Sequence, residues 1–185
     1  MEKKENQRVA LTKRLIGEAF VTLLRKKSIS QIAIRELCQT AGINRSTFYA
    51  HYGSQYDVLS ELTDGYLAEI EKTIASADAA DKADITRRVT IVLCYAEKNL
   101  ELSRLLLNHN LDPAFAEKLV SLPKIQDMLS TALSWVEADE LGCYIDFIVS
   151  GCYRLIRDWL NADERIPPAQ QAGRILAMAR RVCIE

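Results

Sequence analysis

The sequence predicts an all-helical protein in two parts: an N-terminal three-helix domain over residues 1–53 and a C-terminal helical bundle over residues 54–185, with about nine helices in all. Three observations lead to this class. Apolar residues recur at steps of three and four along most of the chain, no segment shows sustained period-two alternation, and the 185 residues include only 7 glycines and 4 prolines. This pattern is typical of amphipathic helices and gives no indication of a sheet.

The composition indicates a folded protein without membrane-spanning segments. With 49% hydrophobic residues the chain can bury a core, and no apolar run approaches the roughly 18 residues of a membrane-spanning helix. The charged segment 1–6 is not followed by an apolar stretch, so no secretory signal is expected. We therefore expect a soluble, cytoplasmic protein without a membrane partner.

The cysteines and histidines exclude several kinds of site. The five cysteines are odd in number, widely spaced and set in apolar stretches, which favours reduced thiols over disulfides. No C-x-x-C spacing occurs, and His51 and His109 are the only histidines, so neither a metal site nor a cofactor is predicted. Because a His-based triad and a phosphate-binding glycine loop are also missing, we expect no enzyme.

Charge is distributed unevenly along the chain. Residues 1–52 contain ten Lys and Arg against four Glu, a net charge of +6, whereas the whole chain has a net charge of −1. The remaining residues therefore carry −7. A basic end on an acidic body is typical of a protein whose one end meets a polyanion, although a chance cluster of solvated charge would give the same count.

The basic segment has three predicted helices. An apolar stripe predicts the first over about Leu11–Arg25. The second is expected to begin behind Ser30 as N-cap and to end at Gly42. The third begins at Asn44 as N-cap, because Ile43 and Phe48 then take the positions of a hydrophobic staple.

A long fourth helix is expected next. Gly53 interrupts the third helix, and Ser54 with Asp57 forms a capping-box pattern for a new one. Its apolar stripe continues to Ile74, about five turns or roughly 30 Å. Residues 75–81 are small and polar without a stripe, and are expected to be a connector.

Four further helices are predicted before the last pair. One covers about residues 85–96, and a shorter one covers 102–106 and ends at 108–110. Asp112 and Pro113 suit the N-cap and first position of the next helix. Another is expected over about residues 124–138.

The last two helices, 141–160 and 168–183, have more apolar residues than one core-facing stripe needs. An apolar excess of this kind indicates a helical subunit interface and therefore a homodimer. The predicted interface residues are Ile148, Gly151, Cys152, Leu155, Trp159, Ile175 and Ala179.

The second and third helices, joined at Ala41-Gly42-Ile43, have the dimensions of a helix-turn-helix. On a helical wheel, Phe48 and Tyr52 point inward. Ser46, Thr47 and Ala50 then face outward, with Arg45, Tyr49 and His51 on the flanks. A small, polar outer face suits a DNA major groove, and the competing interpretation is a solvated helical hairpin.

The flanking residues suggest separate roles. Thr47 can offer a hydroxyl and a methyl group to base edges, and Arg45 can donate twice to guanine. Tyr49 and His51 are better suited to phosphate contacts, which position the helix without reading sequence.

Residues 34–52, IRELCQTAGINRSTFYAHY, resemble the helix-turn-helix of the TetR family of bacterial regulators, and the likeness extends over about residues 8–62. Two positions depart from the family pattern: Gln55 replaces a Lys that commonly contacts phosphate, and Ala33 replaces a frequent Thr or Ser. Lys3, Lys4, Arg8 and Lys13 can supply charge instead. The predicted DNA-binding residues are Arg35, Asn44, Arg45, Ser46, Thr47, Tyr49, His51 and Gln55.

The resemblance implies a regulator, expected to be a repressor, that binds double-stranded operator DNA as a homodimer and is released by a small-molecule effector. It also implies a ligand cavity in the C-terminal part. Candidate walls are Tyr66, Tyr95, Phe115, Met128, Trp135 and Phe147. Residues of these types at helical spacing also suit an ordinary core.

Two other functions remain open. A thiol or redox sensor would use Cys94, Cys143 or Cys152, although their apolar sequence neighbours predict inert thiols. A protein-binding adaptor with a degenerate helix-turn-helix would account for Gln55 and Ala33, and an operator titration would separate it from a regulator.

Overall fold

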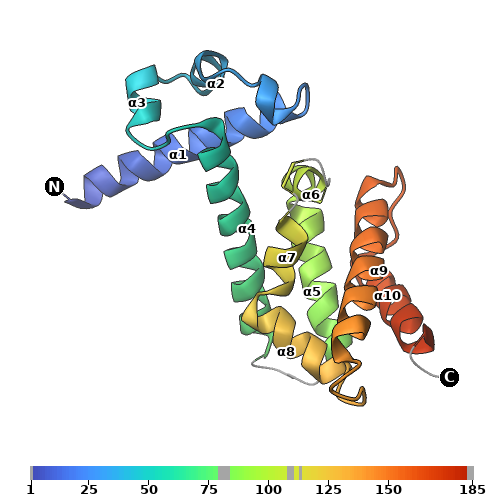
Figure 1. Cartoon of the computed structure of the whole chain (residues 1–185). Coiled ribbons are helices and arrows are strands. Elements are labelled where there is room, and N and C mark those ends of the chain that lie inside the picture. The colour runs from blue at the N-terminus through green and yellow to red at the C-terminus, as the bar shows by residue number, and fades with distance from the viewer. Residues whose placement is uncertain (1, 79–83, 108–110, 113, 183–185) are drawn as a thin grey trace. The chain divides into compact units, whose positions relative to one another are not determined.

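The computed structural model describes residues 2–78, 84–107, 111, 112 and 114–182 (Figure 1). Within those ranges the chain forms ten α-helices and one short 3-10 helix, η1, and no strand. The predicted all-helical class is confirmed. The chain divides into two compact units, residues 1–65 and 66–185, and the helix that contains this boundary is α4, Gln55–Asp78.

The first unit begins with α1, Glu2–Leu24, which starts nine residues before the predicted Leu11. Residues 2–10 lack an apolar stripe, so the helix period gave no signal there. They are rich in Glu, Lys and Gln, which have high intrinsic helix propensity and extend the helix. Buried Ile16 and Phe20 form its inward face, and α2, Ile34–Ala41, packs on this helix.

The start of the second helix differs from the prediction. Ser30 is not its N-cap but lies inside η1, Ile29–Gln31. Ser28 caps that short helix, and the Gln31 side chain accepts a hydrogen bond from the Ser28 amide at 3.2 Å. This local capping box takes up residues 28–31, so α2 begins only at Ile34, behind Ala33.

The turn between α2 and α3, Arg45–Tyr49, follows the prediction. Gly42 ends α2 with a φ of 68°, in the left-handed region that favours glycine. Asn44 is the N-cap of α3, although its side chain makes no capping hydrogen bond. The helix ends at Tyr49, before the predicted interruption at Gly53.

The start of α4 is fixed by Asp57. Its carboxylate accepts hydrogen bonds from the backbone amides of Gly53 at 2.7 Å and Ser54 at 3.0 Å. At its other end, α4 continues through residues 75–78, so the predicted connector is wrong there, because alanine and serine in this stretch are compatible with a helix. The rest of that predicted connector lies outside the described residues.

The second unit is built around α5, Ile85–Lys98, which packs against α6, α8, α9 and α10. The final helix α10 has its most extensive packing on α5. The remaining helices are α6, Leu100–Leu106; α7, Phe115–Val120; α8, Pro123–Ala132; α9, Leu141–Asn161; and α10, Pro168–Val182.

Two predicted boundaries in this unit need correction. The helix expected to have Asp112 as N-cap and Pro113 as its first residue begins instead at Phe115, behind Ala114. The Asp112 carboxylate accepts a hydrogen bond from the Ala114 amide at 3.1 Å, ahead of the helix. The helix expected to reach residue 138 ends at Ala132. There the indole N–H of Trp135 donates to the Ala132 carbonyl at 3.2 Å, which replaces a helical partner at the C-terminal turn. The predicted end at 108–110 and the position of Pro113 lie outside the described residues.

Candidate nucleic-acid interface

The inward side of the helix-turn-helix is formed by two aromatic residues. Phe48 is completely buried and Tyr52 almost so, and their ring centroids lie 5.6 Å apart. Leu37, Cys38 and Ala41 of α2 are also buried. The predicted inward positions are confirmed, and with them the rotation of α3 about its axis.

Tyr52 is held by a charged pair from two other helices of the same unit. The Lys13 ammonium lies 5.6 Å from the Tyr52 ring centroid and 2.7 Å from the Glu61 carboxylate. Burial raises the pKa of Tyr52 to about 12, and the neighbouring Glu61 adds to the rise. The charge of Lys13 is therefore partly neutralised within the unit.

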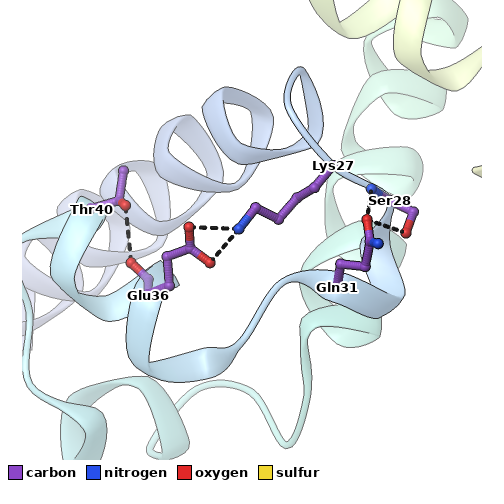
Figure 2. Close-up of polar contacts among 5 residues, drawn as sticks. All are labelled: Lys27, Ser28, Gln31, Glu36 and Thr40. Atoms are coloured by element: carbon purple, nitrogen blue, oxygen red, sulfur yellow. Dashed lines mark hydrogen bonds and ion pairs between the residues drawn. The ribbon is translucent and has the colours of Figure 1, made fainter.

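A second ion pair joins the turn after α1 to α2. The Lys27 ammonium lies 2.8 Å and 2.9 Å from the two carboxylate oxygens of Glu36, as Figure 2 shows. Thr40 lies one turn further along α2 and donates its hydroxyl to the Glu36 carbonyl at 2.9 Å. Figure 2 also shows the Ser28–Gln31 contact, and together these bonds hold residues 27–31, which connect α1 to α2, in place.

The opposite side of α3 is open to solvent. Arg45, Ser46 and Ala50 are exposed, and Tyr49 keeps 53% of its surface accessible. Thr47 and His51 are half-buried, so they are less prominent than the helical wheel predicted. The structure thus places an arginine, a serine and a tyrosine on one exposed helix of a basic unit.

The other predicted contact residues flank this helix in sequence. Arg35 is exposed in the first turn of α2, and the exposed Asn44 side chain is not occupied by capping. Gln55, the first residue of α4, is half-buried. Its neighbour Tyr56 is 51% exposed and was not predicted; a large aromatic residue next to a capping box was the available signal.

The second unit contains a cavity of about 400 Å³ lined by residues of α4, α5 and α7–α10. Of the six predicted wall residues, Tyr66, Phe115, Met128 and Trp135 line it. Tyr95 is absent from its lining and packs on Tyr66, with ring centroids 5.1 Å apart. Phe147 is also absent, because it lies on the exposed side of α9 with 62% of its surface accessible.

The predicted subunit-interface residues are divided among three environments. Trp159 and Ile175 are buried inside the unit, where the Trp159 indole donates to the Ile166 carbonyl at 2.9 Å. Ile148, Cys152 and Ala179 line the cavity, and the buried Ile175 lines it as well. Leu155 is half-buried and Gly151 is exposed. Much of the apolar excess of α9 and α10 is therefore used within one chain.

The cysteines differ in exposure. Cys38 is buried, and burial raises the pKa of the half-buried Cys152 to about 11. Cys94 and Cys143 are exposed, which corrects the expectation drawn from their apolar sequence neighbours: each occupies a solvent-facing position of its helix. Cys183 lies outside the described residues. The part of the chain that the structure describes contains no cluster of side chains suited to a metal ion and no helix long and apolar enough to span a membrane.

Comparison with known proteins supports a regulatory protein. Two curated relatives are each 28% identical: a transcriptional activator of the dhaKLM operon, DhaS, from Lactococcus lactis, over 48% of this chain, and an uncharacterised HTH-type regulator, YxbF, from Bacillus subtilis, over 54%. The matches span only 45% and 27% of those relatives' own lengths.

Solved structures share the fold. A TetR transcriptional regulator from Streptococcus agalactiae superposes with a TM-score of 0.72 at 21% identity, covering 97% of this chain and 99% of the other. The TetR family regulator PfmR from Thermus thermophilus gives 0.65 at 18% identity, covering 91% and 97%. At these identities the likeness concerns the fold.

The family itself is shown by the C-terminal part. Residues 84–181, just over half of the chain, match the family model TetR_C_8, described as a transcriptional regulator C-terminal region. The resemblance found in residues 34–52 thus agrees with an independent match in the other unit. The chain belongs to the TetR family of transcriptional regulators.

Proposed function

We propose that this regulator binds operator DNA through the exposed side of α3, as a two-fold dimer, and that a small molecule in the second unit changes its affinity for DNA. The proposal that the protein binds DNA rests on one observation: α3 has one buried side and one exposed side. Phe48 anchors one side in the core, while Arg45, Ser46 and Tyr49 are left in solvent on a basic unit.

Roles follow from chemistry. Arg45 can donate to guanine O6 and N7, and Thr47 can contact a base edge with its hydroxyl or methyl group. Tyr49 has its hydroxyl at the end of a rigid ring and suits a phosphate. Arg35 and Asn44 can add backbone contacts from the preceding helix and the turn, and Gln55 and His51 can contribute side-chain hydrogen-bond donors.

The test is a titration of the protein against an operator selected from a random duplex pool. Thr47→Ala should reduce discrimination between the selected and a scrambled duplex, whereas Tyr49→Phe should weaken both alike. Thr22→Ala, at an exposed position of α1, is the matched control and should change neither affinity. Equal loss on both duplexes for Thr47→Ala would contradict its role in base reading.

For dimerisation we propose a face of α9 and α10 that differs from the sequence prediction. Phe147 and Met178 are large apolar residues that remain 62% and 51% exposed. Exposed Gly151 lies four residues after Phe147, and exposed Gly173 and Ala177 lie on α10. Small residues beside exposed apolar ones allow close helix packing between two copies.

Sedimentation of Gly151→Glu tests this face. A Cβ at Gly151 would meet nothing within 4 Å in the chain, so the substitution leaves the protomer intact and places a charge in the proposed interface. We expect the wild type to sediment as a dimer at micromolar concentration and the variant as a folded monomer. Cys94→Glu, on the exposed side of α5, should remain dimeric, and a monomeric wild type would contradict the proposal.

We expect repression by occupation of a promoter, while the Lactococcus relative is named an activator. Transcription from a template that carries the selected operator distinguishes the two, since added protein lowers the transcript level in one case and raises it in the other.

A further inference from the structure

The cavity of the second unit is large enough for a substantial organic molecule. Its volume of about 400 Å³ is more than twice that of the ~150 Å³ apolar cavity that is known to admit benzene. It lies within the range of ligand sites in proteins generally. All of its described lining belongs to residues 66–180, so the cavity is a property of this unit alone.

The lining is almost entirely hydrocarbon. Leucine, isoleucine, valine, alanine, methionine and aromatic side chains supply most of it. Among the described residues that line the cavity, none carries a carboxylate and Arg180 carries the charge. The buried Arg88 of α5 is outside the lining and donates to the Asp127 carboxylate at 2.9 Å.

The hydroxyl groups in the wall are already engaged. The Tyr66 hydroxyl lies 2.7 Å from the Ser103 hydroxyl, which also contacts the Ala96 carbonyl at 2.8 Å. The Tyr153 hydroxyl donates to the Leu107 carbonyl at 3.1 Å. Burial raises the pKa of Tyr66 to about 12, which agrees with a wall that does not solvate charge.

The exposed members of the lining mark where the cavity meets solvent. They are Thr131 and Ala132 of α8, Trp135 of the following turn, and Arg180 of α10. Trp135 packs edge-on against Tyr144, with ring centroids 5.5 Å apart. The cation of Arg180 therefore stands at the opening, and the interior behind it is apolar.

We propose that the cavity binds an uncharged, mainly hydrocarbon compound, aliphatic or aromatic, and rejects organic cations. Moving an ion into such an interior without a partner costs far more than transferring a neutral group, since the lining offers no carboxylate to pair with a cation. Arg180 at the opening repels cations further. The claim that this compound regulates operator binding rests on the proposed function. The claim that the compound binds in the cavity does not.

The experiment compares three probes with the same ten-carbon chain: 1-decanol below its solubility limit, and decanoate and decyltrimethylammonium below their micelle concentrations. Binding is followed by the fluorescence of Trp135, one of two tryptophans in the chain, and by calorimetry. We expect decanol to bind at least tenfold more tightly than decyltrimethylammonium. Trp135→Phe should abolish the fluorescence response while calorimetric binding persists, because Trp159 lies outside the lining.

Variants locate the bound probe. Val92→Phe places a ring in the cavity from α5 and should weaken decanol at least tenfold, whereas Cys94→Phe, exposed on the same helix, should not. Arg180→Gln should weaken decanoate and leave decanol unchanged. The three-probe comparison on the unmutated chain decides the question even if Val92→Phe does not fold.

Two results would overturn the inference: equal or tighter binding of decyltrimethylammonium, or decanol binding that Val92→Phe leaves unaltered in a folded protein. Neither result bears on operator binding, which is measured without any probe. A failure of the ligand class is therefore distinguishable from a failure of the proposed function.

Discussion

At the scale of single residues, burial separates side chains that look alike in sequence. Phe48 and Tyr52 could be placed inward from the helical wheel, since a short helix packed on one side has one inward face. Tyr95 and Phe147 could not be excluded from the cavity in the same way. An aromatic side chain can line a cavity, pack on a neighbouring ring or face solvent, depending on which distant helices pack beside it. The period of a single helix gives no information about those neighbours.

Cys94 and Cys152 are expected to differ in their reactivity toward alkylating agents. The pKa of Cys152 is raised to about 11 by burial. At pH 8 only about 0.1% of such a thiol is the reactive thiolate. We expect iodoacetamide at pH 8 to alkylate exposed Cys94 at least tenfold faster than Cys152, with the difference shrinking as the pH approaches 11.

Peptide mapping by mass spectrometry resolves the individual thiols. Alkylation of Cys152 at the rate of Cys94 would show that its thiolate is accessible, and would return it to consideration as a redox-sensing residue.

At the scale of elements, the helix period located the helices and local hydrogen bonds set their ends. Gly42 could be identified as the end of α2 because glycine has a specific conformational role there. The Ser28–Gln31 capping box is a local S-x-x-Q pattern that the prediction of Ser30 as N-cap missed. The Trp135 indole that ends α8 could not be identified, because its backbone partner is visible only in three dimensions.

A pair of glycines tests the turn of the helix-turn-helix. A Cβ would meet nothing within 4 Å at Gly42 or at Gly65 of α4, so space is not the difference between them. Gly42 has a φ of 68°, where alanine is strained by about 1 kcal/mol or more. Gly65 lies within a helix, where alanine adds about 0.5–1 kcal/mol of stability.

We therefore expect Gly42→Ala to lower the free energy of unfolding and to weaken operator binding, while Gly65→Ala raises stability. Urea unfolding followed by circular dichroism measures both. A Gly42→Ala protein as stable as the wild type would show that the left-handed turn does not fix α2 against α3.

At the scale of the whole molecule, the sequence predicted two parts, a basic DNA-binding end and an acidic body, and the structure has two compact units. The predicted interface was harder to place, because the same apolar helices α9 and α10 also form part of the cavity wall. An excess of apolar residues in a helix sequence indicates that more than one of its faces is buried. It does not tell whether a ligand, a neighbouring helix or a second chain buries the additional face.

Regulation by a ligand requires reciprocal coupling between the two units, and α4 contains residues of both. If a cavity ligand weakens operator binding tenfold, about 1.4 kcal/mol, then operator must weaken that ligand by the same factor. We expect calorimetry of decanol with and without saturating operator to show this reduction. A ligand that binds equally in both titrations is not an effector.

The most direct measurement is a footprint of the selected operator combined with the number of protomers bound. We predict two protected half-sites related by two-fold symmetry, one helical turn or a multiple of it apart, roughly 34 Å or more. Two protomers should bind each duplex, and Arg45→Ala should remove the footprint while Arg87→Ala, exposed on α5, preserves it. A footprint that survives Arg45→Ala, or that forms with a single protomer, would contradict DNA recognition by α3 in a dimer.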